Sequence, residues 1–177
     1  MSITCGTLSV LDLTGCYKNN SGGISECYIA YLSDLTGSCY TVSTGNTLLI
    51  TDIQTSGKVF YKYKPSRYSS NWTEVTPDSE TNTVFEQTAT LVFPKRSGEQ
   101  AFQMKIVAQS LTVLIIRDSN SKYFLIGAYN GLSAAPSYDS GKALTDNNAT
   151  TLVLKGVESS PSYEVSASII NGLVNMV

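Results

Sequence analysis

The feature that most constrains the fold is an alternation of less and more apolar side chains over residues 83–93. Successive side chains of a β-strand point to opposite faces of its sheet, so an alternation of this length predicts a long strand. Pro94 follows it and is expected to end the strand, because proline cannot donate to a sheet ladder. We expect the core-facing side to carry Phe85, Gln87, Ala89, Leu91 and Phe93.

Shorter segments of similar composition predict a chain that is mainly β. Two apolar, β-branched segments, residues 111–117 and 122–128, flank a turn at residues 118–121 and indicate a hairpin. Further strands are predicted at residues 47–53, 59–64, 150–157 and 163–169, followed by an apolar tail at 170–177. Two polar segments, residues 65–82 and 133–149, are expected to be long loops.

One segment has helical periodicity instead. Ser97 is followed three residues later by Gln100, as in a capping box, and Glu99 places a carboxylate in the first turn. We therefore predict a single packed helix near residues 98–110. The apolar spacing is expected to turn Ala101, Phe102, Ile106 and Ala108 toward a sheet.

The chain has 177 residues, 42% of them apolar, which is enough for one domain with a buried core. Its first third differs from the rest, because residues 1–57 hold all four cysteines and a single basic side chain, Lys18. We predict one β-rich domain over residues 1–177, with residues 1–46 as an N-terminal arm or extension.

Histidine is absent. That removes Ser-His-Asp and Cys-His nucleophile pairs and the usual general base near neutral pH. The carboxylate pairs Asp78 with Glu80 and Glu158 with Glu164 fall in loops or beside turns, where acidic residues are common for solvation. No glycine lies in a phosphate-binding motif. We therefore expect no enzymatic activity, no catalytic residue and no cofactor.

The cysteines also argue against a metal site. They are spaced about eleven residues apart, unlike the close pairs of a zinc site, at Cys5, Cys16, Cys27 and Cys39. We interpret them as small semi-buried thiols on neighbouring strands, with a four-thiolate metal site as the alternative. Residues 146–148 offer oxygen ligands but lack the further acids of a calcium loop, so we interpret them as a turn.

A net charge of −2 disfavours a protein that binds nucleic acid through a strongly basic surface. One segment is locally basic and aromatic, since residues 61–72 interleave aromatic rings with Lys62, Lys64 and Arg67. Such a segment could stack on single-stranded bases, but an amphipathic strand with extended lysines explains it more simply. The first residues lack the features of a secretory signal, and no apolar run is long enough to cross a membrane, so we expect folding in a cytoplasm.

Residues 122–165 carry short motifs in a distinctive order. The series begins with K-Y-F-L-I-G at 122–127, N-G-L at 130–132 and S-G-K-A at 140–143. It continues with D-N-N at 146–148, T-L-V-L-K-G-V-E at 151–158 and S-P-S-Y-E-V at 160–165. This order resembles the C-terminal half of virion structural proteins, of the tail-tube or head–tail connector ring kind, from tailed phages of Bacteroidetes hosts.

The start of the chain adds to this resemblance. Residues 13–15 and 20–23, L-T-G and N-S-G-G, are similar to openings of virion proteins from crAss-like phages. The resemblance is close over about a quarter of the chain. Ala149 departs from the pattern, in which a glycine follows the Asp-x-Asn.

The resemblance implies a β-sandwich or barrel with one helix packed on the outside, assembled as a hexameric or dodecameric ring. It implies contacts with other phage tail, portal or connector proteins, and transient, non-specific contact with genomic DNA in the lumen. The protein would reside in the virion, at the tail or head–tail junction, after assembly in the host cytoplasm and without membrane contact. The polar segments 65–82 and 133–149 would dock on the adjacent ring.

We predict subunit contacts in two segments of the chain. The candidate interface residues are Tyr61, Tyr63, Tyr68, Trp72, Tyr129, Asn130, Gly131 and Asp146. For the lone tryptophan, packing on its own domain is an equal alternative. The alternative function is a β-sandwich binding module on a virion, with carbohydrate or receptor bound by an aromatic patch around Tyr61, Tyr63 and Trp72.

Overall fold

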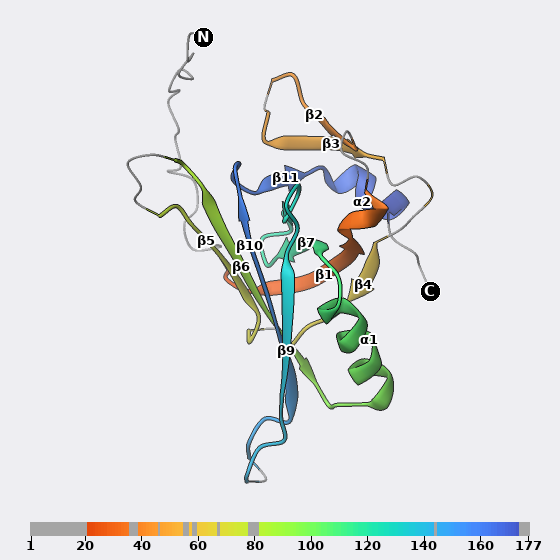
Figure 1. The fold of residues 1–177 in the computed structure, drawn as a ribbon, viewed down its shortest axis with the longest axis vertical. Helices are drawn as coiled ribbons and strands as arrows, with labels where there is room; N and C mark the ends of the chain where they lie inside the picture. The colour runs from red at the N-terminus through yellow and green to blue at the C-terminus, as the bar shows by residue number, and fades with distance from the viewer. Residues whose placement is uncertain are drawn as a thin grey trace.

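Two β-sheets and two α-helices make up the part of the chain that the computed structural model describes (Figure 1). That part comprises residues 21–35, 39–45, 47–54, 57, 60–66, 68–77, 82–143 and 145–173. The predicted mainly β fold is confirmed. Both sheets end in unpaired strands within these residues, so the sheets form an open sandwich and no closed barrel.

The larger sheet has seven strands in the order β2-β3-β11-β8-β7-β1-β4. Their bounds are β1 Ile24–Tyr31, β2 Tyr40–Val42, β3 Leu49–Ile53, β4 Tyr61–Tyr63, β7 Thr112–Asp118, β8 Tyr123–Ile126 and β11 Tyr163–Val165. A short 3-10 helix, η2 (Leu32–Asp34), follows β1. The predicted hairpin is confirmed as the antiparallel pair β7 and β8.

The smaller sheet has four antiparallel strands in the order β5-β6-β10-β9. They are β5 Asn71–Val75, β6 Phe85–Pro94, β9 Ser133–Asp139 and β10 Ala149–Glu158. The alternation predicted for β6 is confirmed, because Gln87, Ala89, Leu91 and Phe93 are buried and the residues between them face the other side, although Phe85 is only half-buried. The β9–β10 hairpin extends away from the rest of the domain (Figure 1).

The expectation of two long loops is wrong, because each segment contains an edge strand of the smaller sheet. Strand β5 lies within residues 65–82 and β9 within residues 133–149. An edge strand with one solvated face carries few large apolar side chains, and most residues of β9 are exposed. Its composition therefore resembles that of a loop.

Helix α1 (Gly98–Ala108) begins where the capping pattern predicts, since the Gln100 amide donates a 3.1 Å hydrogen bond to Ser97 Oγ. The predicted inner face is wrong. Met104 and Val107 are the buried residues, whereas Phe102 is 58% exposed. Apolar side chains occur all around this helix, so periodicity does not single out the face that packs.

The prediction of a single helix is also incomplete. The segment predicted as a strand at 163–169 is a three-residue strand followed by helix α2 (Ala167–Leu173). Ile170 and Leu173, one turn apart, are buried in this helix. The helix end is tied to the sheet by a 2.8 Å hydrogen bond from the Phe60 amide to the Leu173 carbonyl.

The larger sheet is buried on both faces. One core lies between the two sheets and includes Ile29, Leu91, Leu114 and Leu152, with α1 against it. The other core lies on the opposite face, where Ile115 and Leu125 pack with residues of α2. Burial on both faces explains why β7 reads as a continuous apolar run.

The N-terminal segment contributes to this sheet. Strand β1 pairs with both β4 and β7. Residues 1–46 were expected to form an arm, but residues 24–42 of this stretch supply β1, η2 and β2. Cys27 on β1 and Cys39, just before β2, are free thiols that are more deeply buried than expected. They do not lie on neighbouring strands, because β1 and β2 lie toward opposite ends of the sheet. Cys5 and Cys16 lie outside the described residues.

Candidate functional site

The predicted interface residues do not form one surface. Tyr61 and Tyr63 lie on the edge strand β4, and Tyr68 and Trp72 lie just before and within β5. Tyr129, Asn130 and Gly131 form a turn after β8, and Asp146 lies in the β9–β10 connection. The structure thus distributes the eight residues over four places.

The aromatic and basic stretch at β4 is divided between two sides of the strand. Tyr61 is 51% exposed, whereas the Tyr63 ring packs against Phe93 at 6.1 Å between centroids. Lys62 forms a 2.8 Å ion pair with Glu26, and its ammonium lies over the Tyr28 ring. The described residues of this stretch therefore present no continuous base-stacking platform.

Trp72 faces the other sheet. Its ring lies 5.4 Å from that of Phe124, between centroids, and packs against the core between the sheets. Tyr68 differs completely, because it is 84% exposed and has a positive φ of 64°. For a tyrosine this left-handed conformation is strained.

The turn at residues 129–131 is held by Glu158, which is only 2% exposed. Its Oε1 accepts hydrogen bonds from the amides of Tyr129 (3.1 Å) and Asn130 (2.9 Å), while its Oε2 is buried without a partner. Gly131 has φ +75°, which the tight turn requires. Glu164 bonds Lys122 instead, so the two carboxylates considered as a pair have separate structural roles.

Three tyrosines pack around this turn. Tyr129 contacts Tyr40 and Tyr163 edge-on, with centroids 5.7 and 6.2 Å away. Burial and a hydrogen bond with Tyr163 raise the pKa of Tyr129 to about 12, so its phenol is neutral at physiological pH. Tyr129 nevertheless remains 48% exposed and available for contact.

Asp146 stabilises its own loop. Its Oδ2 accepts hydrogen bonds from the amides of Lys142 (2.7 Å) and Ala143 (2.8 Å), and these bonds lower the pKa of the carboxyl group. These bonds do not bear out the turn expected at residues 146–148, because only Asp146 forms a bend and Asn147 and Asn148 lie in no turn. Within the described ranges, no cluster of three or more potential metal-ligating side chains is found.

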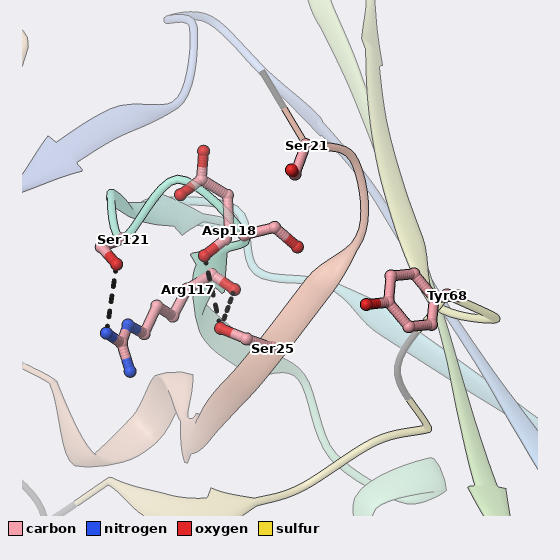
Figure 2. Close-up of a pocket in the computed structure, with 7 residues that line it drawn as sticks. Ser21, Ser25, Tyr68, Arg117, Asp118 and Ser121 are labelled. Atoms are coloured by element: carbon pink, nitrogen blue, oxygen red, sulfur yellow. Dashed lines mark hydrogen bonds between the residues drawn. The ribbon is translucent and has the colours of Figure 1, made fainter. Parts of the chain in front are cut away.

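A polar cavity lies where β1 begins, beside the β7–β8 turn (Figure 2). Its volume is about 270 Å³, and it is lined by Ser21, Ser25, Tyr68, Arg117, Asp118, Ser119 and Ser121. A second cavity of about 260 Å³ shares Ser21 and Asp118 with it and reaches Asn71 and Trp72. Sequence reasoning treated residues 118–121 only as a turn, and their density of polar side chains was the available signal.

Charges at this cavity are balanced. Arg117 donates to Ser121 Oγ at 3.2 Å and lies 3.6 Å from the Glu26 carboxylate. Its Nε is buried without a partner. Asp118 lines the same cavity, so a cation and an anion face it together.

The edge strand β5 is a further candidate for contact with another chain. Among the described residues it pairs only with β6, which leaves one side of its backbone open. Its single charged residue, Glu74, is turned inward, where its Oε2 accepts from Gln87 Nε2 at 2.9 Å. No proline or lysine interrupts the strand.

Three features of the described residues are suited to binding another molecule. They are the backbone edge of β5, the aromatic turn at residues 129–131 and the polar cavity beside the β7–β8 turn. No helix in the described part of the chain is long and apolar enough to span a membrane. Comparison with protein-family models, curated proteins and solved structures finds no match to this chain.

Proposed function

We propose that this protein is a virion structural subunit that assembles with copies of itself into a ring of a phage tail tube or head–tail connector. The observation that carries the proposal is the open edge of β5, which no strand among the described residues covers. Natural proteins protect edge strands with lysine, proline, bulges or a covering segment, because an open edge pairs with other chains. Strand β5 has none of the first three, and its outward side chains, Asn71, Thr73 and Val75, are uncharged.

The two edges of the smaller sheet support a ring rather than a symmetric dimer. Strand β9 forms the opposite edge; Pro136 removes one backbone donor there, and the other six residues of the strand keep theirs. A contact between β5 of one copy and β9 of the next joins different edges. Such a head-to-tail contact repeats around an axis and closes into a ring when the rotation permits.

The outer face of the smaller sheet suits a DNA conduit. Thr88, Thr90, Thr151 and Val153 occupy its centre, and Lys155 is the only basic residue among the strand positions of this face. A surface with so little positive charge binds phosphate weakly and lets DNA pass. The motif resemblance at residues 122–165 supplies the phage context, including the virion location, assembly in the host cytoplasm and neighbouring tail or portal proteins.

The test is the oligomeric state of the full chain over a concentration series, measured by light scattering and by electron microscopy of the same samples. We expect rings with a central opening. Thr73→Lys places a charge at the open edge and should raise the concentration needed for half-assembly about tenfold, corresponding to about 1.4 kcal/mol per contact.

Thr41→Lys is the matched control, because it places the same charge on β2, an exposed edge of the other sheet. It should assemble like the unaltered protein, and both variants should keep the same thermal unfolding midpoint. A 19.1 kDa monomer at every concentration would contradict self-assembly. Equal assembly of the two variants would rule out β5 as the contact.

A further inference from the structure

The polar cavity of Figure 2 has preformed walls. Ser119 Oγ donates to the Gly22 carbonyl at 2.9 Å, and Ser25 Oγ donates to the Arg117 carbonyl at 3.1 Å. The Ser21 amide also donates to Asn120 Oδ1 at 3.1 Å. These bonds fix the start of β1 against the β7–β8 turn, so the cavity needs no rearrangement before it receives a ligand.

Several polar groups of this cavity have hydrogen-bonding capacity left over. Within the described structure, the hydroxyl groups of Ser21 and Tyr68 make no hydrogen bond. The Asp118 carboxylate accepts one bond at each oxygen, from the Lys122 amide and from Asn120 Nδ2, and can accept more. A ligand here meets donors and acceptors together.

The charge balance selects an uncharged ligand. An anion drawn to Arg117 meets the carboxylate of Asp118, and Glu26 already compensates the guanidinium. A cation drawn to Asp118 meets Arg117. A compound with many hydroxyl groups satisfies both kinds of site, because each hydroxyl both donates and accepts.

Tyr68 completes the cavity with an aromatic surface. Its hydroxyl points toward the side of Ser25 and Asp118, across the cavity (Figure 2). The ring is 84% exposed, so its packing within the described domain does not offset the conformational strain of the backbone at φ 64°. An exposed ring beside hydroxyl-rich walls can stack on the apolar face of a sugar ring.

We infer that this cavity binds a neutral saccharide, with a pyranose ring stacked on Tyr68 and vicinal hydroxyls hydrogen-bonded to Asp118, Ser21 and Arg117. The adjoining cavity at Asn71 and Trp72 would receive a second sugar unit. This inference does not depend on ring assembly. It places the binding-module alternative at a site that shares Trp72 with the expected aromatic patch but does not include Tyr61 or Tyr63.

The test is saturation-transfer NMR on the full chain, which remains applicable if the protein is assembled. The probes are the methyl glycosides of glucose, galactose, mannose and N-acetylglucosamine, with sodium acetate as an anionic comparison. We expect saturation transfer to at least one glycoside at millimolar concentration and none to acetate.

Two variants locate the site. Tyr68→Ala should weaken glycoside binding about tenfold, and Ser21→Ala about threefold. Tyr61→Ala is the matched control, an exposed tyrosine on β4 that does not line the cavity, and should bind as the unaltered protein does. The inference is overturned if no glycoside receives saturation, if acetate alone does, or if Tyr68→Ala binds like Tyr61→Ala.

Discussion

Glu158 shows how one buried side chain can organise a turn without taking part in chemistry. Glu158 ends β10, which pairs with β6 in the smaller sheet. Its Oε1 reaches the amides of Tyr129 and Asn130 in the turn that follows β8 of the larger sheet. The sequence pairs it with Glu164 as a candidate acid pair only by proximity along the chain. A buried carboxylate that accepts two amide hydrogen bonds is a structural anchor.

We expect Glu158→Ala to lower the free energy of unfolding by about 1–3 kcal/mol, because it leaves two amides without their acceptor. Glu158→Gln retains an acceptor oxygen and removes the charge of the unpartnered Oε2, so its loss should be less than half as large. Urea unfolding at neutral pH measures both. Equal losses for the two variants would contradict the role assigned to Oε1.

At the scale of elements, helix α1 separates what a capping motif predicts from what packing decides. The cap is local, since Ser97 bonds an amide three residues away. The buried face is not local, because it depends on which surface of the sandwich the helix meets. Met104 and Val107 meet that surface, and Phe102 points outward.

Met104→Ala should therefore lower the free energy of unfolding by about 2–4 kcal/mol, as expected when a buried side chain leaves a cavity. Phe102→Ala should change it by less than about 0.5 kcal/mol despite removing a larger side chain. The two are matched, since both lie within one helix and both introduce alanine. If Phe102→Ala lowered the free energy of unfolding more than Met104→Ala in chemical denaturation, the buried face of α1 would be the one expected from the sequence.

Three strands of the larger sheet are joined by Glu26 on β1, which bonds Lys62 on β4 and lies near Arg117 on β7. Burial raises the pKa of Glu26, but hydrogen bonds from Lys62 and Tyr28 and the attraction of both cations outweigh it, so the pKa is lowered. The folded protein then holds this proton less tightly than the unfolded chain. The resulting stability is present above the ordinary carboxyl pKa and is lost as pH falls through the lowered one.

Glu26→Gln tests this linkage. The variant should be less stable than the unaltered protein at neutral pH, and the difference should shrink toward zero as pH falls through the acidic range. Thermal unfolding at a series of pH values measures it. Glu86→Gln, on the exposed side of β6, is the control and should show no such convergence. A difference that is constant with pH would contradict the assignment.

At the scale of the whole molecule, a short polar chain joins the two sheets. The Gly127 amide, beyond β8, donates to Gln87 Oε1 at 2.9 Å, and Gln87 Nε2 donates to Glu74. Glu74 also accepts from the Ser162 amide at 2.7 Å, just before β11. This chain fixes how the smaller sheet sits on the larger one, in addition to the apolar core between them.

Gln87→Leu keeps the apolar pattern of the inner face but leaves the Gly127 amide without its acceptor and removes one of the two hydrogen bonds to Glu74, which keeps the bond from the Ser162 amide. We expect it to lower the free energy of unfolding by about 1–3 kcal/mol. Thr88→Leu, at the next position but on the outer face, should have little effect. Denaturant unfolding of both variants is the measurement. If Gln87→Leu stabilised the protein, the polar chain would not be needed to hold the smaller sheet on the larger one.

Local signals in the sequence determined the mainly β class, the β7–β8 hairpin, the inner face of β6 and the start of α1. Each depends on residues within one strand, one turn or one helical turn. Tertiary structure alone decided that β5 and β9 are strands, because an edge strand is defined by its partner and not by its own composition. It also decided which face of α1 packs, and that residues 167–173 turn into a helix on the far face of the larger sheet.

The candidate sites divide in the same way. Tyr68 and Tyr129 could be named as candidate contact residues, since aromatic side chains are recognisable by type, but their exposure follows only from the tertiary structure. The saccharide cavity was not, because Ser21 and Ser121 are a hundred residues apart in the chain and meet only when β1 pairs with β7. Hydroxyl groups carry no pattern of their own along a sequence, and only the pairing of distant strands brings them to one place.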